Sequence, residues 1–313
     1  MKKSSQTIIV NIISVAVIGI MVLVSELIHS KEVIFPEISA ISLGALISPK
    51  FAWNTSKAKM IICITVCAIC GYSISAFLPL NIYFKLLIAF IIGNIVLIFS
   101  RTSFAPMLSA IILPVILKTD SIIYPISAFS ITVVIVALLY LFETTGIKGT
   151  YFYEPNTINL KKDSIAFFKR FVIYAILSYL SVISNCMIAL APPLVVAFTE
   201  LCNPNSKARK YPVNICFIMM ISAFTGEMTR QIFCTLYGLP LFVGVIVAVS
   251  IMIIILDTLK IYIPPMLAIT TLAYLVKANT VPYTVQITVG FSLLMLCAIV
   301  LFKDKKPVLS DNK

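Results

Sequence analysis

Long apolar stretches, one after another from residue 7 to residue 302, are the feature that most constrains this chain. A bilayer has a hydrocarbon core about 30 Å thick, which takes roughly 20 helical residues to span. Within it, a helix satisfies every backbone hydrogen bond inside its own segment. We therefore predict an all-α, polytopic membrane protein.

Composition excludes the soluble classes. The chain is 60% hydrophobic and 12% charged, whereas soluble domains average roughly 45–50% apolar and about 25% charged residues. Its 24 Lys+Arg outnumber 12 Asp+Glu, but these charges separate apolar stretches and report membrane orientation. We expect a lipid bilayer and a small-molecule or ion substrate as partners and no nucleic acid. Self-association is left open.

Breaks in the apolar pattern give about twelve membrane segments in two halves. They cover 7–29, 35–48, 60–78, 82–100, 104–117, 124–142, 165–184, 187–201, 213–236, 239–256, 264–276 and 283–302. The predicted organisation is an N-terminal membrane half (1–142), a cytoplasmic linker (143–164), a C-terminal membrane half (165–302) and a cytoplasmic tail (303–313). The first segment is too long for a signal peptide and is expected to be retained.

The second and fifth segments of each half are short, about 20–23 Å of helix. If all twelve segments cross and the N-terminus is cytoplasmic, 19 Lys and Arg face inward, 4 face outward and Arg230 lies in the membrane. If the short segments turn back, the split becomes 12 to 11. The positive-inside rule favours crossing. This predicts a multi-pass protein of the cytoplasmic (inner) membrane with both termini in the cytoplasm.

The short segments share a pattern. Residues 36–43 and 106–113 both read P-x-[IL]-S-A-I-x-L, and Arg101 precedes Pro106-Met-Leu as Lys260 precedes Pro265-Met-Leu. We predict a long–short–long unit that occurs four times, with one short proline-initiated helix in each copy. Each half is then an inverted 3+3 repeat, and the two halves form a 6+6 parallel repeat. Chance similarity of apolar helices is the alternative, since prolines often start helices.

These motifs resemble the HPP family of integral membrane proteins, whose signature runs Arg-Thr-x-His-Pro-Pro at the start of a membrane helix. Residues 101–106 match with Phe104 in place of the histidine, and residues 260–265 match with Ile263 in that place. Residues 204–214 look like the family's upstream loop. The resemblance covers about 35–117 and 191–276 and identifies a tandem, degenerate copy that lacks the motif histidine. It implies a permease scaffold; family members are implicated in nitrite transport.

Helix N-termini carry unpaired N–H groups and partial positive charge, which suits an anion or carboxylate. Segments too short to span can bring these ends near the bilayer middle, where Arg101, Arg230 and Lys260 would attract charge. The candidate substrate-binding residues are Pro36, Glu37, Ser39, Arg101, Pro106, Ser109, Pro192, Pro193, Glu227, Arg230, Lys260, Pro264 and Pro265.

Ionisable groups within membrane segments are costly and usually functional. Glu227 and Arg230 stand at i, i+3 and are expected to pair on one helix face, either as a site or gate or as a structural clamp. Glu37 either carries a coupling proton or caps its helix near the outer surface.

No metal site, cofactor or catalytic residue is expected. Cys63, Cys67 and Cys70 share a helix face, but bilayer-embedded thiols usually pack as small apolar groups. The chain has no phosphate-binding glycine loop, H-E-x-x-H motif or nucleophile elbow, so we do not expect an enzyme.

The predicted function is that of a secondary transporter, a permease for a small anionic or carboxylate-bearing solute. The solute would bind near the bilayer middle at the N-termini of the short helices. One alternative is a membrane-embedded subunit or a signalling or assembly partner without transport. The other is a major-facilitator-like permease, although that superfamily's basic, glycine-containing loop is not visible between residues 49 and 59.

Overall fold

The computed structural model describes residues 3–203, 206–276 and 282–302, and within these ranges the chain is helical with no strand. Eight of the described helices are long and apolar enough to cross a membrane. They are α1 (Lys3–Leu27), α3 (Lys57–Phe77), α4 (Ile82–Phe99), α6 (Ile123–Thr144), α7 (Leu160–Ile183), α9 (Pro212–Thr229), α10 (Leu241–Leu259) and α12 (Tyr283–Leu301). The prediction of an all-α, multi-pass membrane protein is confirmed.

Four shorter helices lie where the short segments were expected. They are α2 (Glu37–Ile41), α5 (Pro106–Leu117), α8 (Pro192–Leu201) and α11 (Pro264–Leu272). A π-helical segment, Ser42–Ile47, extends α2, and a second one, Arg230–Leu236, extends α9. Proline occupies the first turn of α5, α8 and α11, where its fixed φ angle suits a helix start.

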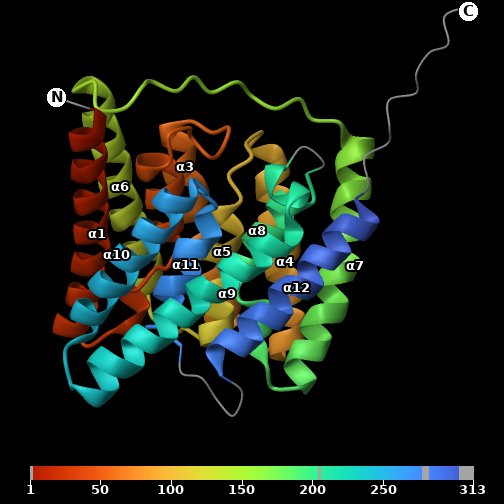
Figure 1. The fold of residues 1–313 in the computed structure, drawn as a ribbon. Helices are drawn as coiled ribbons and strands as arrows, with labels where there is room; N and C mark the ends of the chain where they lie inside the picture. Colours follow the sequence, from red (N-terminus) through yellow and green to blue (C-terminus); the bar gives the residue numbers. More distant parts are fainter. Residues whose placement is uncertain (1–2, 204–205, 277–281, 303–313) are drawn as a thin grey trace, which may run out of the picture.

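The four short helices form the centre of the bundle, and we call them the short-helix core. Every residue of α2 and α11 is buried. In the long helices, only 22–50% of the residues in the most apolar 18-residue stretch are buried. These helices expose large apolar side chains on their outer faces. Figure 1 shows α5, α8 and α11 surrounded by longer helices. A helix that is apolar all round must be enclosed by other helices.

Helices of different predicted units pack in pairs, both between the two halves and within each half. The first helix of each predicted unit pairs with a counterpart, α1 with α10 and α4 with α7. The last helices pair as α3 with α6 and α9 with α12. Within the core, α2 contacts α11 and α5, and α8 contacts α5 and α11. The core therefore contains helices from all four predicted units.

Two glycines allow close helix contact at matching places. A Cβ atom on Gly71 of α3 would lie 2.4 Å from the Ile111 carbonyl oxygen of α5. A Cβ atom on Gly226 of α9 would lie 2.4 Å from the Thr270 carbonyl oxygen of α11. Only glycine fits at either crossing.

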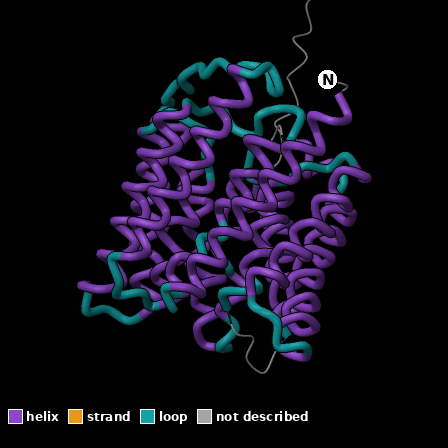
Figure 2. The backbone as a smooth tube through the Cα atoms, turned by 90° about the vertical axis from the view of Figure 1, so that its left-hand side faces the viewer, coloured by secondary structure: helices purple, strands orange, loops and turns teal. Residues whose placement is uncertain are grey.

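The linker is shorter than the predicted 143–164. Helix α6 continues through Thr144 and α7 begins at Leu160, because the Asn159 side chain accepts a hydrogen bond from the Lys162 N–H (3.1 Å) and caps the helix. Residues 145–159 cross one end of the bundle, at the top of Figure 1, which we call the linker end. Figure 2 shows most loops gathered at the two ends. The predicted tail, 303–313, lies outside the described residues.

Side-chain hydrogen bonds fix the linker to the bundle. The Asn54 amide donates to the Glu154 carbonyl oxygen (2.5 Å), and its oxygen accepts from the Tyr151 hydroxyl (3.0 Å). The Tyr153 hydroxyl donates to the Arg101 carbonyl oxygen (2.9 Å). The linker is therefore part of the folded structure at this end.

Candidate functional site

Glu227 binds the start of a neighbouring helix. Its carboxylate accepts hydrogen bonds from the backbone N–H groups of Tyr283 (3.1 Å) and Thr284 (3.0 Å) and from the Thr284 hydroxyl (2.6 Å). These groups open α12, whose N-terminal N–H groups have no partner within their own helix. Glu227 is therefore an N-terminal cap for α12.

Arg230 binds the end of a different helix. One guanidinium nitrogen, Nη1, donates to the carbonyl oxygens of Ala273 (2.6 Å) and Val276, just beyond α11. The expected pairing of Glu227 with Arg230 is wrong, because each side chain bonds a different helix and no ion pair joins them. The backbone from Glu227 to Arg230 is still α-helical, since the Arg230 N–H bonds the Gly226 carbonyl oxygen, so the separation comes from the helix-end groups that each side chain binds instead.

Glu37 lies inside the bundle. Its side chain is 1% exposed, and the residues before it, Ile34 and Phe35, are fully buried. The Ser109 hydroxyl of α5 donates a hydrogen bond to Glu37 Oε1, and Oε2 has no hydrogen-bond partner. Two predicted site residues from different units thus meet in the core.

A second polar contact joins α2 to α11. The Ser39 and Thr271 hydroxyl oxygens are 2.6 Å apart, and both side chains are fully buried. Ser39 was a predicted site residue, whereas Thr271 was missed, because a threonine in an apolar helix gives no distinct signal.

The predicted prolines start the short helices from inside the bundle. Pro36, Pro106, Pro192, Pro193, Pro264 and Pro265 are all buried. The residues directly before α5 and α8, Ala105 and Ala191, are each 2% exposed. Ile263, before α11, is half-buried. At least α5 and α8 therefore begin within the protein.

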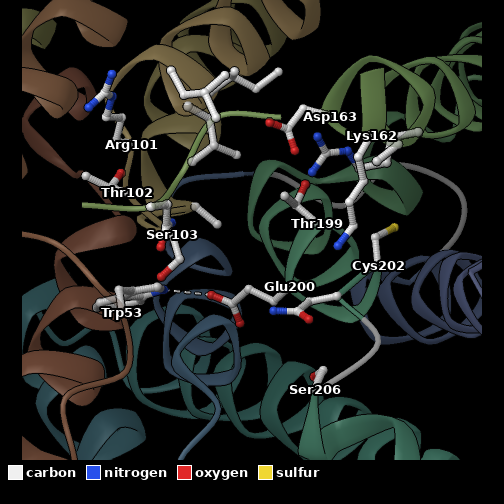
Figure 3. A pocket seen from close by; sticks show the side chains of 18 of the residues that line it. Trp53, Arg101, Thr102, Ser103, Lys162, Asp163, Thr199, Glu200, Cys202 and Ser206 are labelled. Carbon is white, nitrogen blue, oxygen red and sulfur yellow. Dashed lines mark hydrogen bonds between the residues drawn. The ribbon is translucent and has the colours of Figure 1, made fainter. Parts of the chain in front are cut away.

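A cavity of about 510 Å³ lies at the linker end between the two halves, and we call it the seam cavity. The first half contributes Trp53 and residues 101–103 and 105, and the second contributes residues 199, 200, 202 and 203 together with part of α7. Figure 3 shows Trp53, Thr102 and Ser103 on one side and Thr199 and Cys202 on the other. Trp53 Nε1 donates a hydrogen bond across it to Glu200 Oε1 (2.8 Å).

The lining of the seam cavity contains both basic and acidic side chains. The basic residues are Arg101, Lys162 and Arg170, and the acidic residues are Asp163 and Glu200. The Arg101 backbone is left-handed (φ 55°), and Figure 3 shows its side chain turned away from Glu200. The Arg170 Nε atom is buried and has no hydrogen-bond partner. An anion entering the cavity would find donors at Lys162 and Arg170.

The other predicted basic residue, Lys260, does not line the seam cavity. It ends α10 in the same left-handed conformation (φ 55°) and is exposed. Sequence reasoning missed Trp53, Glu200 and Arg170, which come from a loop, the end of α8 and α7. Their proximity depends on tertiary packing and has no local sequence signature.

A second cavity, of about 700 Å³, lies at the C-terminal end of α9. Glu227, Arg230 and Tyr283 line it. Two predicted site residues, Glu227 and Arg230, therefore line one cavity although each binds a different helix.

The described residues hold no group of three or more His, Cys, Asp or Glu side chains that is suitable for a metal ion. The chemistry that the arrangement offers is therefore that of carboxylates, hydroxyls and basic side chains. Comparison with protein-family models, with curated proteins and with solved structures finds no match to this chain.

Proposed function

We propose that this protein is a secondary transporter for a small anionic or carboxylate-bearing solute. The observation that carries the proposal is the seam cavity, which is lined by both halves of the chain and contains Lys162 and Arg170. A transporter that rocks one half against the other binds its solute at their interface. The cavity would be the entrance from the linker end.

We also propose the fourfold repeat and twelve crossings. The Tyr124 hydroxyl donates to the Ala110 carbonyl oxygen (2.9 Å), and the Tyr283 hydroxyl donates to the Ile269 carbonyl oxygen (2.6 Å), each 14 residues earlier in the chain. The two contacts are 159 residues apart, as are Arg101 and Lys260, which share one backbone conformation. The paired contacts of first and last helices support the same symmetry.

The linker end is proposed to be cytoplasmic. With all twelve segments crossing, 19 Lys and Arg face this side and 4 face the other. The seam cavity would then open to the cytoplasm of a cell whose inner membrane holds the protein.

The HPP resemblance supports a small anion as the solute. The degenerate motif at residues 101–106 lies at the start of α5, and residues 101–103 and 105 line the seam cavity. Residues of the motif therefore line the same cavity as Lys162 and Arg170.

Reconstitution tests the proposal. A thermal-shift screen of small anions, carboxylates and neutral metabolites selects a solute, and flux of that solute is measured in liposomes that contain only this protein. Lys162→Met and Arg170→Met are expected to weaken solute binding at least tenfold, since a hydrogen bond to a charged group contributes about 1.5–3 kcal/mol.

Lys161→Met is the matched control. Lys161 precedes Lys162 on α7 but does not line the cavity, so its removal should leave flux unchanged. Equal losses in both lysine variants would contradict a site in the seam cavity. A stable protein without flux that co-purifies with an obligate partner would support the non-transporting alternative.

A further inference from the structure

Glu37 accepts fewer hydrogen bonds than two other acids of the bundle, Glu26 and Glu227. Glu227 accepts three hydrogen bonds, and Glu26 accepts two from the N–H groups of Leu241 (2.6 Å) and Phe242 (3.1 Å). Glu37 accepts one from the Ser109 hydroxyl, and its Oε2 atom has no partner. This acid is the least satisfied of the three.

Among the residues that the structure describes, no basic side chain interacts electrostatically with Glu37. The Tyr124 hydroxyl of α6 interacts electrostatically with Glu37 and also with the Cys67 thiol of α3. Tyr124 donates its hydroxyl hydrogen to Ala110 and not to Glu37. From α5 comes Ser109, and from α11 comes Thr271, which bonds Ser39. An ionised Glu37 would therefore lack a counter-charge.

The ligand that best fits such a carboxylate is a proton. Burying an ionised carboxylate without a partner is very costly, and a proton removes the charge without needing further ligands. A metal cation would need several oxygen ligands around it. Two other core hydroxyls, Ser39 and Thr271, already bond each other across the α2–α11 contact.

Glu37 also lies close to the proposed solute path. Its donor, Ser109, is four residues along the chain from Ala105, which lines the seam cavity. Four helical residues correspond to about 6 Å. A small separation around the start of α5 would expose the carboxyl group to water from the cavity.

We propose that Glu37 is the coupling proton site of this transporter. The carboxylate takes a proton from hydronium, which leaves water, and returns it to water on the other side of the membrane. One proton then accompanies one solute charge, so an anion and a proton move together. The inference rests on the proposed transport function and names its coupling ion.

Infrared spectroscopy tests the site without any solute. The wild-type protein should show the carbonyl stretch of a protonated carboxylic acid, with a shift in D₂O. Glu37→Gln should remove this band, whereas Glu26→Gln, which alters an acid held by two N–H groups, should retain it. An unchanged band in Glu37→Gln would overturn the proposal.

Flux in liposomes tests the coupling. A pH gradient should drive solute accumulation in the wild type, and Glu37→Gln should reduce this accumulation at least tenfold while solute exchange at equal pH continues. Accumulation at the wild-type level in Glu37→Gln would refute proton coupling at this residue. If Glu37→Gln does not fold, Glu37→Asp keeps the titratable group and should shift the infrared band and not abolish it.

The two proposals fail separately. A wild-type protein with the infrared band but without flux of any solute would refute transport and leave the proton site standing. Solute flux that is unchanged in Glu37→Gln would support transport and refute proton coupling at Glu37.

Discussion

Trp53 of the first half and Glu200 of the second half are joined by a hydrogen bond of 2.8 Å at the wall of the seam cavity. The indole is 3% exposed and meets the Phe104 ring edge to face, with 5.2 Å between ring centroids. It also covers Gly44 so closely that a Cβ atom there would lie 2.5 Å from the ring. Movement of one half against the other must disturb this contact.

Because Trp53 is the one tryptophan in the sequence, intrinsic fluorescence reports this contact directly. We expect a saturable change in the emission of the wild-type protein when the transported solute is added. Glu200→Gln keeps an oxygen acceptor for the indole and should retain the signal, whereas Glu200→Ala should shift the emission before solute is added. A solute that is transported without any change in emission would show that the contact stays closed.

Trp53→Phe removes the indole donor and leaves the Glu200 carboxylate without it. An unsatisfied buried polar group costs about 1–3 kcal/mol, so the free energy of unfolding should fall by about that amount. Thermal unfolding in detergent measures the loss. Stability equal to that of the wild type would mean that water replaces the indole at Glu200.

Gly71→Ala and Gly226→Ala should both destabilise the protein. Each new methyl group would meet a backbone oxygen of a core helix at 2.4 Å, and overpacking typically costs about 1–3 kcal/mol. Gly149→Ala is the matched control, because nothing lies within 4 Å of a Cβ atom at that position. Similar losses in Gly71→Ala and Gly226→Ala would also agree with the proposed equivalence of the two halves. An undiminished melting temperature in both would argue against these close crossings.

The apolar segmentation predicted much of this fold. It gave the order of long and short helices, and the shared proline motifs indicated where the short ones begin. It also selected Glu37, Ser39 and Ser109, all of which lie in the short-helix core. These features depend on local hydropathy and on prolines, which a single sequence displays directly.

Contacts between distant residues could not be predicted in this way. The expected Glu227–Arg230 pair does not form, because Glu227 binds the start of α12 and Arg230 binds the carbonyl oxygens beyond α11. Trp53 and Glu200 are 147 residues apart and approach only when the two halves pack. The hydropathy pattern of the sequence therefore does not predict this contact.

Arg230 is expected to act on stability more than on solute binding. Arg230→Met removes both hydrogen bonds to the carbonyl oxygens beyond α11 and should lower the free energy of unfolding by about 1.5–3 kcal/mol. Arg230→Lys keeps a positive charge at this helix end and should recover part of the loss. Melting temperature and uptake per folded molecule are measured together. Lost uptake with unchanged melting would instead make Arg230 a solute ligand.

Lys148 gives the protein a pH-dependent stability. This linker residue donates from Nζ to the carbonyl oxygens of Leu46 (2.7 Å), Ser48 (2.9 Å) and Ala45, at the end of the π-helical segment that extends α2. Burial lowers the pKa of Lys148 from its ordinary value of 10.5 to about 8, although the nearby carboxylate of Glu143 acts in the opposite direction. The folded chain therefore releases this proton at a lower pH than the unfolded chain does.

Between pH 8 and pH 10.5 the unfolded chain binds more protons at Lys148, so this group's contribution to the free energy of unfolding rises with pH. Lys148→Met has no titratable group and loses three hydrogen bonds, so it should melt at a lower temperature than the wild type at pH 7. The difference in free energy of unfolding between the wild type and Lys148→Met should widen between pH 8 and pH 10, by at most about 1.4 kcal/mol per pH unit. Lys161→Met, at an exposed position of α7, shows the pH trend of the rest of the chain. A gap that stays constant or narrows as pH rises would show that the helix-end carbonyls hold the proton on Lys148 more strongly than burial removes it.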